Sequence, residues 1–304
     1  MDNARVAEYL SSQIGEPVEV HATHRLTVGH SRAMFVVDST AGKFVLRIER
    51  GGVFGTSSAA EFSLMQSLHA AGLPVANVRW FEPTGSVLGN PFFVMDYIEA
   101  DQPAEERAMD PAAAKAFVRA LANVHAVDHT AHLPTVDPEQ TTHILIEHWR
   151  NVGRSSGVPR IPLLDAAEMW LHQKAPQTRR VCLVHGDPGP GNVLSTNGEV
   201  LALTDWEFGH VGDPAEDWSF CLSMRGSRTM SREAWLALFE SEAGVKMSKD
   251  QCDYWEAFNL YKGACANLTC LGLFEGGLNR SPDLAIIGTA LHRSFLRRLV
   301  DITR

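Results

Sequence analysis

The strongest constraint on the fold is an Asn-Gly pair that lies between two short apolar segments in the second half of the chain. Asn197 and Gly198 form this pair, and Asn-Gly between apolar runs favours a two-residue type I′ β-hairpin. Counting outward from the turn along both strands places Asn192 opposite Leu203. Asp205 then lies just beyond Asn192 across the ladder, so the hairpin brings an amide and a carboxylate together at its open end.

The first third of the chain has the pattern of a small antiparallel sheet with one helix. Segments rich in β-branched and aromatic residues are separated by turns around Gly29 and at 39–42. A helix capped by Ser57 or Ser58 follows, and Gly72 ends it. The expected strands are 18–26, 33–38, 43–49, 75–81 and 91–98.

Beyond residue 99 the apolar spacing changes from the period of a strand to that of a helix. Asp110 and Pro111 are typical of the cap and first turn of a helix. The segment 101–109 is the best boundary between the two patterns. We therefore expect an α+β fold with an N-terminal lobe at 1–99, a hinge at 95–100 and a mainly helical lobe at 100–304, with helices at 111–127, 141–151, 162–174 and from 215 onward.

Composition excludes several classes of protein. The 304 residues include 27 basic and 36 acidic side chains, a formal charge of -9, which disfavours binding to nucleic acid or to an anionic membrane. The five cysteines contain no Cys-x-x-Cys pair, so neither a zinc ribbon nor a disulfide framework is indicated. The first fifteen residues lack the apolar core of a secretory signal, and no apolar run is long enough to span a membrane. We expect a soluble, cytoplasmic protein of unspecified oligomeric state.

Three oxygen-bearing side chains suggest the chemistry. The Asn192 amide and the Asp205 carboxylate form a hard oxygen site that suits Mg²⁺ and leaves positions for water and phosphate oxygens. Asp187, in the glycine- and proline-rich loop before the hairpin, is placed to face an acceptor hydroxyl. Phosphoryl transfer requires such a set, and Asp187 and Asn192 keep the five-residue spacing of a kinase catalytic loop.

The competing interpretation is that these residues serve only as turns and caps, where Asp and Asn are common. The Asp-Trp-Glu and Gly-Asp-Pro-x-x-Asp sequences that follow favour catalysis. His185 is expected to be a hydrogen-bonded scaffold residue, because an aspartate already supplies the base, and His125 is expected in the core. Asp213 and Asp217 are expected to cap a helix.

The whole pattern, His-Gly-Asp-x-x-x-x-Asn with its two sequels, resembles the aminoglycoside phosphotransferase and choline kinase family, whose fold is similar to that of protein kinases. The segments VLRIERGG, PFFVMDYIEA and WLHQKAPQTRRVCLVHGD are similar to the branch of that family that is also found fused to acyl-CoA dehydrogenases. The resemblance covers roughly residues 20–300. Its motif residues are His185, Gly186, Asp187, Asn192, Asp205, Trp206, Glu207, Gly212, Asp213, Pro214 and Asp217.

The resemblance implies a role for each motif residue. Asp187 would be the catalytic base, and Asn192 and Asp205 the metal ligands. Glu207 would be a further carboxylate beside this metal or at a second one. Asp217, at the start of a helix, would brace the catalytic loop.

The resemblance also implies where ATP binds. The segment 26–35, with Gly29, His30 and Ser31, matches the turn that covers the nucleotide, although it carries one glycine fewer than the loop of protein kinases. The hinge from Met95 to Ile98, which includes Tyr97, would contact adenine through its backbone groups.

Two departures from the family pattern concern positive charge. Arg47 stands on the third strand where protein kinases keep a phosphate-binding lysine, and Glu61 on the next helix is positioned to pair with it. A surface ion pair is the alternative for these two residues. Lys43, further along the same strand face, is the other candidate phosphate ligand. The loop 188–191 contains no basic residue, so neutralisation would depend on the metal and Arg47.

The sequence favours an ATP- and Mg²⁺-dependent phosphotransferase acting on a hydroxyl of a small molecule. The alternative is a nucleotide-binding module with weak or no activity, and phosphorylation or nucleotidylation of proteins is a third option. An acidic cluster could bind a polycation, but Lys246, Lys249 and Lys262 dilute it, so a smaller or less basic alcohol is favoured. The resemblance to the dehydrogenase-fused branch suggests a hydroxy acid. We expect the ligand in a groove formed by residues 141–160 and 252–275. The acidic residues are Glu233, Glu240, Glu242, Asp250, Asp253 and Glu256.

Overall fold

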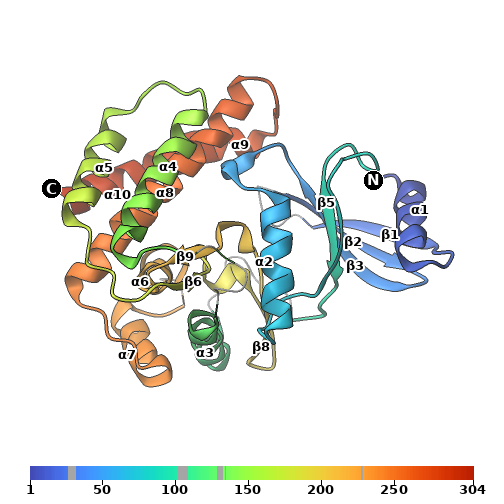
Figure 1. Ribbon diagram of the computed structural model, residues 1–304, viewed down its shortest axis with the longest axis horizontal. Helices are drawn as coiled ribbons and strands as arrows, with labels where there is room; N and C mark the ends of the chain where they lie inside the picture. Colours follow the sequence, from blue (N-terminus) through green and yellow to red (C-terminus); the bar gives the residue numbers. More distant parts are fainter. Residues whose placement is uncertain (27–31, 102–108, 129–132, 134, 227–228) are drawn as a thin grey trace.

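The computed structural model describes residues 1–26, 32–101, 109–128, 133, 135–226 and 229–304. Gly29, His30 and Ser31, the predicted nucleotide-covering turn, lie outside the described residues. The described chain forms two lobes, with a sheet in the first and mostly helices in the second (Figure 1). The α+β, kinase-like fold class predicted from the sequence is confirmed.

The N-terminal lobe is built on five antiparallel strands in the order β1-β2-β3-β5-β4. Strand β3 was expected at 43–49 and is found one residue longer, because the turn before it closes at Ser39 and Gly42. The strands are β1 (Val20–Leu26), β2 (Arg32–Ser39), β3 (Gly42–Glu49), β4 (Val78–Glu82) and β5 (Phe92–Asp96).

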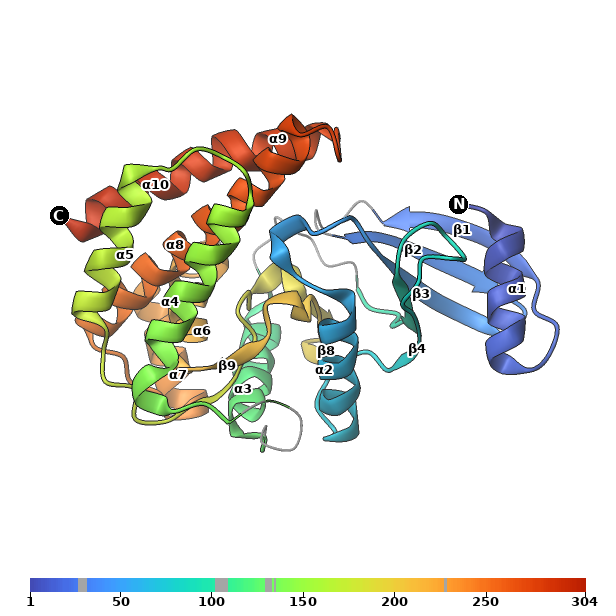
Figure 2. The ribbon, with the colours of Figure 1, turned by 45° about the horizontal axis from the view of Figure 1, so that its top comes forward.

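Two helices flank this sheet, one more than the sequence pattern led us to expect. Helix α1 (Asn3–Ile14) is capped by the Asp2 side chain and buries Val6 and Leu10 against one face. Helix α2 (Ser58–Ala70) lies between the sheet and the helical lobe, and α1 lies at the far end (Figure 2). A short 3₁₀ turn, η1 (Val53–Gly55), connects β3 to α2.

The second lobe is mainly helical, as predicted. Its long central helix α8 begins at a capping box of Ser248 and Gln251 and packs against five other α-helices. The helices are α3 (Pro111–Ala126), α4 (Pro138–Ser155), α5 (Pro162–Lys174), α6 (Ala215–Phe220), α7 (Arg232–Ala243), α8 (Lys249–Glu275), α9 (Pro282–Ile286) and α10 (His292–Thr303), with π-helical turns η4 (Cys221–Arg225) and η6 (Ile287–Leu291).

The motif segment folds into two small antiparallel ribbons between the lobes. These are β6 with β9 and β7 with β8, and the 3₁₀ turns η2 and η3 lie at their ends. Their bounds are β6 (Cys182–Val184), η2 (Pro190–Asn192), β7 (Val193–Thr196), β8 (Glu199–Leu203), η3 (Trp206–Phe208) and β9 (His210–Gly212).

The Asn-Gly turn is confirmed, but the register predicted beyond it is wrong by one residue. Asn197 and Gly198 both have positive φ, 53° and 81°, as a type I′ turn requires. Leu201 forms a bulge in β8, so Val193 rather than Asn192 pairs with Leu203. The Asn192 carbonyl instead accepts a hydrogen bond from the next backbone amide, that of residue 204, at 3.0 Å. Asn192 and residue 205 therefore still lie at the same end of the hairpin.

One hydrophobic core joins the two lobes. Leu64 and Met65 on α2 and Phe93 on β5 belong to the same buried cluster as Leu183 and Trp206 beside the motif loops. The motif loops are therefore held by packing from both lobes. In the described part of the chain, no helix is both long and apolar enough to cross a lipid bilayer.

Candidate active site

The loop that carries Asp187 is fixed from below by a buried carboxylate. Asp217 accepts hydrogen bonds from the backbone amides of His185 at 2.8 Å and Gly186 at 2.9 Å. Burial alone would raise the pKa of Asp217, but its hydrogen bond from His125 and the nearby histidines outweigh burial and hold that pKa below its usual value. A charged Asp217 thus braces the loop, in agreement with the role that the family resemblance implied.

The histidine of the motif is part of this scaffold. His185 Nδ1 accepts from the amide of Asp187 at 3.3 Å, and its Nε2 lies 3.0 Å from the Thr204 carbonyl. The ring is buried against Trp206 with centroids 4.4 Å apart, and burial lowers the pKa of His185. These contacts fit a neutral imidazole that donates from Nε2. His125 is likewise buried and bonded to Asp217, as the sequence predicted.

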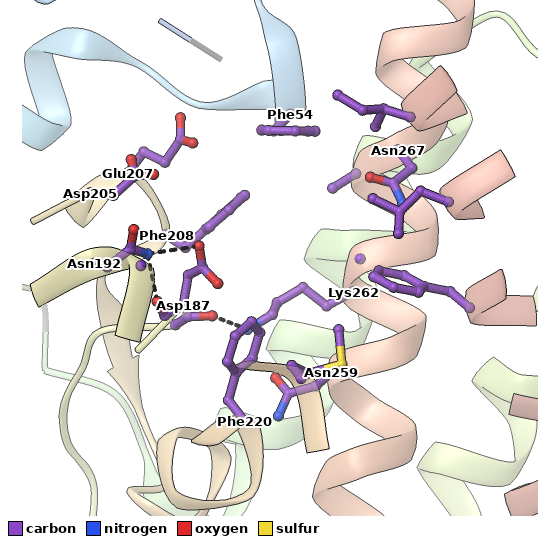
Figure 3. A pocket seen from close by; sticks show the side chains of 18 of the residues that line it. Phe54, Asp187, Asn192, Asp205, Glu207, Phe208, Phe220, Asn259, Lys262 and Asn267 are labelled. Atoms are coloured by element: carbon purple, nitrogen blue, oxygen red, sulfur yellow. Dashed lines mark hydrogen bonds between the residues drawn. The ribbon is translucent and has the colours of Figure 1, made fainter. Parts of the chain in front are cut away.

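Asp187 and Asn192 are hydrogen-bonded to one another. The Asn192 amide nitrogen donates to the Asp187 backbone carbonyl at 2.8 Å and to its Oδ2 at 3.0 Å. Because the nitrogen faces Asp187, the amide oxygen lies on the side of Asp205 and Glu207 (Figure 3). The five-residue spacing therefore orients the aspartate and turns an oxygen towards the second acidic residue.

Asp205 adopts a left-handed backbone conformation, with φ 66° and ψ 59°, at the end of the hairpin. Its Oδ1 accepts a hydrogen bond of 2.6 Å from Arg47 Nη2. The same guanidinium binds Glu61 through Nε at 3.0 Å and Nη2 at 2.9 Å. Arg47 and Glu61 are both buried, so the structure excludes the surface ion pair and joins β3, α2 and the motif hairpin at one point.

Arg32 is a second buried arginine of this site, and the sequence analysis did not identify it. Its side chain is 1% exposed and lies 3.9 Å from Glu61 and 3.8 Å from Glu207. Thr56 links the same groups, because it accepts from Arg32 at 2.9 Å and donates to Glu207 at 3.0 Å. Strand alternation could have indicated Arg32. Arg32 and Met34 lie on the same face of the sheet, and Met34 pairs with Arg47 on the next strand.

Glu207 is therefore held by the N-terminal lobe instead of pointing freely at the hairpin end. Its side chain is 2% exposed. Burial, reinforced by the nearby Asp205 carboxylate, raises the pKa of Glu207 to about 8. The structure brings Glu207 next to Asp205 as predicted.

Lys262 lies under the Asp187 loop, although the sequence analysis named it only as one of three lysines that dilute the acidic cluster. Its Nζ donates to the Gly186 carbonyl at 2.6 Å and to Glu216 at 2.5 Å. Glu216 also contacts His210 at 3.1 Å and is fully buried. The available signal was a single lysine within the apolar stretch of α8, where a charge is rarely buried without a partner.

The motif loop and the end of the hairpin line one end of a cavity of about 380 Å³. Asp187, Asn192 and Asp205 lie at that end, and their side chains face the cavity across from α8 (Figure 3). The opposite wall comes from Phe54 and from residues of α8, η6 and α10. The predicted groove between 141–160 and 252–275 is therefore right for the second segment, which lines the cavity, and wrong for the first. Helix α4 packs behind α8 and contributes no described residue to the lining.

Other predicted residues lie away from this cavity. Lys43 is exposed and lies 5.8 Å from the centre of the Tyr97 ring, four residues along β3 from Arg47. Met95 and Tyr97 lie at the end of β5 and are not among the lining residues, so their contact with adenine stays a prediction. Of the proposed acidic cluster, Glu256 reaches the cavity rim only through its ion pair with Arg298.

A five-stranded lobe and a helical lobe, with a braced aspartate and an amide-carboxylate pair between them, define the kinase-like class of phosphotransferase. The chain belongs to the phosphotransferase enzyme family, whose model matches residues 23–249. This membership confirms the family resemblance read from the motif and the prediction that the chain is a phosphotransferase.

Individual proteins show the same relationship. Acyl-CoA dehydrogenase family member 10 of Mus musculus is 29% identical over 209 residues, which is 64% of this chain and 20% of that protein. The chain therefore matches about a fifth of that relative's length. A solved structure described as a putative aminoglycoside phosphotransferase from Ralstonia eutropha superimposes with a TM-score of 0.71 at 21% identity, covering 99% of this chain and 98% of the other. A spectinomycin phosphotransferase bound to ADP and spectinomycin gives 0.66 at 14% identity, covering 100% and 98%.

Proposed function

We propose that the protein transfers the γ-phosphoryl group of ATP to a hydroxyl of a small molecule, in a reaction that requires Mg²⁺. The observation that carries the proposal is the position of Asp187, Asn192 and Asp205 at one end of a single cavity. The family match supports phosphoryl transfer, and the ADP bound to the spectinomycin phosphotransferase supports a nucleotide between the lobes. The five cysteines are free and buried, which supports a reducing compartment such as the cytoplasm.

Asp187 is the base in this proposal. Its carboxylate orients the acceptor hydroxyl and takes its proton, while the hydroxyl oxygen forms a bond to the γ-phosphorus and the bond from that phosphorus to the ADP oxygen breaks. The hydrogen bond from Asn192 fixes the orientation of the carboxylate. The Asp217 brace and the Lys262 contact hold the loop in place, so the alcohol meets a preorganised base.

The residues present fit a magnesium ion. Mg²⁺ binds through one or two protein oxygens and takes its remaining ligands from phosphates and water. Asn192 and Asp205 would hold it, and the bound ion supplies neutralisation of the phosphate charge. Among the described residues, no group of three His, Cys, Asp or Glu side chains forms a metal cage, which agrees with an ion held mainly through the nucleotide.

Arg47 is the cation best placed for the nucleotide phosphates. The carboxylates of Glu61, Asp205 and Glu207 outweigh burial and raise the pKa of Arg47, so its charge is permanent. A guanidinium has several donors, and Arg47 keeps Glu61 through Nε and Nη2. We propose that the phosphates and metal displace its contact with Asp205.

The test is ATP consumption by the purified protein across a panel of hydroxyl-bearing metabolites, with the acceptor identified by its phosphorylated product. Asp187→Asn keeps the size of the side chain and removes the base, so turnover should fall by roughly 10²–10⁴-fold. Asp301→Asn, an exposed change on α10, is the matched control and should leave turnover unchanged. Turnover that is equal in wild type and Asp187→Asn would refute the proposed role.

A second candidate function is a nucleotide-binding module that transfers no phosphoryl group. One observation favours it: Arg47 occupies an oxygen of Asp205 that a metal would use. Binding of ATP without any Asp187-dependent product would support this alternative. Acceptor-dependent formation of ADP would exclude it.

A further inference from the structure

The part of the cavity away from Asp187 is mainly apolar. Phe54 and Phe208, whose ring centroids lie 5.7 Å apart, line the cavity together with Phe220 and Phe295. The whole cavity, including the end at Asp187, has a volume of about 380 Å³, which lies at the small end of the range of ~300–1,000 Å³ that is usual for small-molecule sites. An acceptor that fills it must therefore bury a compact apolar body.

The charged side chains of the lining are distributed unevenly. Among the described lining residues, the carboxylates are Asp187, Asp205 and Glu207, and all lie at the proposed phosphoryl-transfer end. Two cations line the cavity. Lys262 lies beneath the Asp187 loop, where its Nζ donates to the Gly186 carbonyl, and Arg298 lies in the other part; each has a carboxylate partner of its own. An ammonium group placed in the part away from Asp187 would be desolvated near Arg298, whose carboxylate partner is already engaged, and would find no carboxylate among the described lining residues there, which is costly.

One face of α8 supplies the polar groups of this wall. Asn259, Gly263 and Asn267 follow one another at intervals of four residues, so they lie on the same side of the helix. A Cβ at Gly263 would come within 2.3 Å of the Phe295 ring, so only glycine lets that ring pack against the helix. The glycine thereby fixes an aromatic surface between the two amides.

Asn267 has an unused hydrogen-bonding group. The residue is 4% exposed, and its buried Nδ2 has no hydrogen-bond partner among the described residues. Figure 3 shows the side chain on the cavity side of α8, with Phe54 opposite. Leaving a buried amide unpaired costs about 1–3 kcal/mol, which a bound ligand would recover.

We propose that the acceptor is a compact, mainly apolar alcohol that carries no positive charge, and that Asn267 hydrogen-bonds to its second polar group. The inference rests on the proposed function, since it takes Asp187 as the end where the reacting hydroxyl lies. Polycationic alcohols are excluded from this site by the unpaired ammonium that they would bury.

The experiment compares two compounds of nearly equal shape that differ in charge. They are 3-phenoxypropane-1,2-diol and 1-amino-3-phenoxypropan-2-ol, and binding of each to the full chain is measured by calorimetric titration. The diol should bind at least roughly tenfold more tightly, because the amine pays an uncompensated desolvation cost. Asn267→Asp adds a carboxylate of the same size and should reverse the preference. Asn151→Asp adds the same charge on the exposed side of α4 and should not.

Wild-type protein that binds the amine as tightly as the diol, or that binds neither compound, would overturn the inference. An Asn267→Asp variant that still binds the diol more tightly than the amine would show that Asn267 does not contact the ligand. Phosphoryl transfer from ATP to the bound diol is measured separately. Its absence would count against the proposed function, while the order of affinities would still decide the present inference.

Discussion

Arg47 Nη2 lies 2.6 Å from Asp205 Oδ1, and this contact joins strand β3 of the first lobe to the motif hairpin of the second. The two residues are 158 positions apart in the chain. Because the same guanidinium also holds Glu61 on α2, one side chain fixes three elements around the proposed phosphate site. In the proposed function, the position of this guanidinium therefore couples the stability of the fold to the binding of nucleotide.

Replacing Arg47 should separate these two effects. Arg47→Lys keeps the positive charge but removes the planar guanidinium, which can hold two acceptors at once. We expect kcat/KM for ATP to fall by roughly 10-fold to 100-fold, which corresponds to the loss of one charge-assisted hydrogen bond. Arg47→Met leaves Glu61 buried without its main partner and should lower the free energy of unfolding by about 3–5 kcal/mol. Urea denaturation measures the second effect. Arg119→Met, which breaks an exposed ion pair with Glu242, should cost at most about 1 kcal/mol; equal losses in both variants would contradict the account.

The ion pair below the catalytic loop predicts a rescue experiment. Lys262→Met leaves Glu216 buried with His210 as its one remaining charged partner in the described part of the chain, so we expect a loss of about 3–5 kcal/mol in the free energy of unfolding. Adding Glu216→Gln removes the uncompensated charge and should restore more than half of that loss. Lys249→Met, on the exposed start of α8, is the control. A double variant no more stable than Lys262→Met would show that the pair is not what holds the loop.

Gly186 is required for steric as well as conformational reasons. Its φ is +83°, and a Cβ there would lie 2.6 Å from the Phe208 carbonyl oxygen. Gly244 also has a positive φ, +66°, but nothing lies within 4 Å of its Cβ position. Gly244→Ala should therefore cost only the left-handed conformation, about 1–2 kcal/mol. We expect thermal or urea unfolding to show a larger loss for Gly186→Ala, accompanied by a lower kcat; equal losses would contradict the predicted clash.

The pair of His210 and Glu216 predicts a pH dependence of stability. Burial alone would lower the pKa of His210, but the Glu216 carboxylate outweighs burial and raises that pKa above its usual 6.5. The folded chain then keeps a proton that the unfolded chain releases. The contribution is complete below pH 6.5 and is lost as the pH rises through the raised pKa.

We therefore expect the advantage of wild type over His210→Gln in unfolding free energy to be larger at about pH 6 than at about pH 9. Urea denaturation of both proteins at each pH gives the comparison. An advantage that grows with pH would mean that the histidine is neutral in the folded protein.

The parts of the fold that sequence predicted well are those that neighbouring residues determine. The strands of the first lobe and the turn at Asn197 follow from alternation and turn chemistry, which act over a few residues. The register beyond that turn was wrong because a bulge at Leu201 depends on how the ribbon packs, and no local pattern encodes it.

The proposed catalytic residues were predictable because they recur at fixed spacing, whereas their charged partners were not. Lys262 contacts a carbonyl 76 residues away, and Arg32 reaches Glu207 from the other lobe. A sequence shows the charge of such residues but not the burial that gives them a role, since burial depends on the tertiary partner. The prediction of the cavity wall was wrong for the same reason. The sequence of α4 has the expected helical period, and only the packing shows that this helix lies behind α8.

The most direct test of the account is a crystal structure of the protein with Mn²⁺ and a non-hydrolysable ATP analogue, examined by anomalous scattering from the metal. The account predicts a manganese peak about 2.1 Å from the Asn192 amide oxygen and an Asp205 carboxylate oxygen, with the Asp187 carboxylate facing the terminal phosphate. A nucleotide-bound structure in which the metal lies away from both residues, or in which Arg47 still occupies Asp205 and no metal is bound, would contradict it.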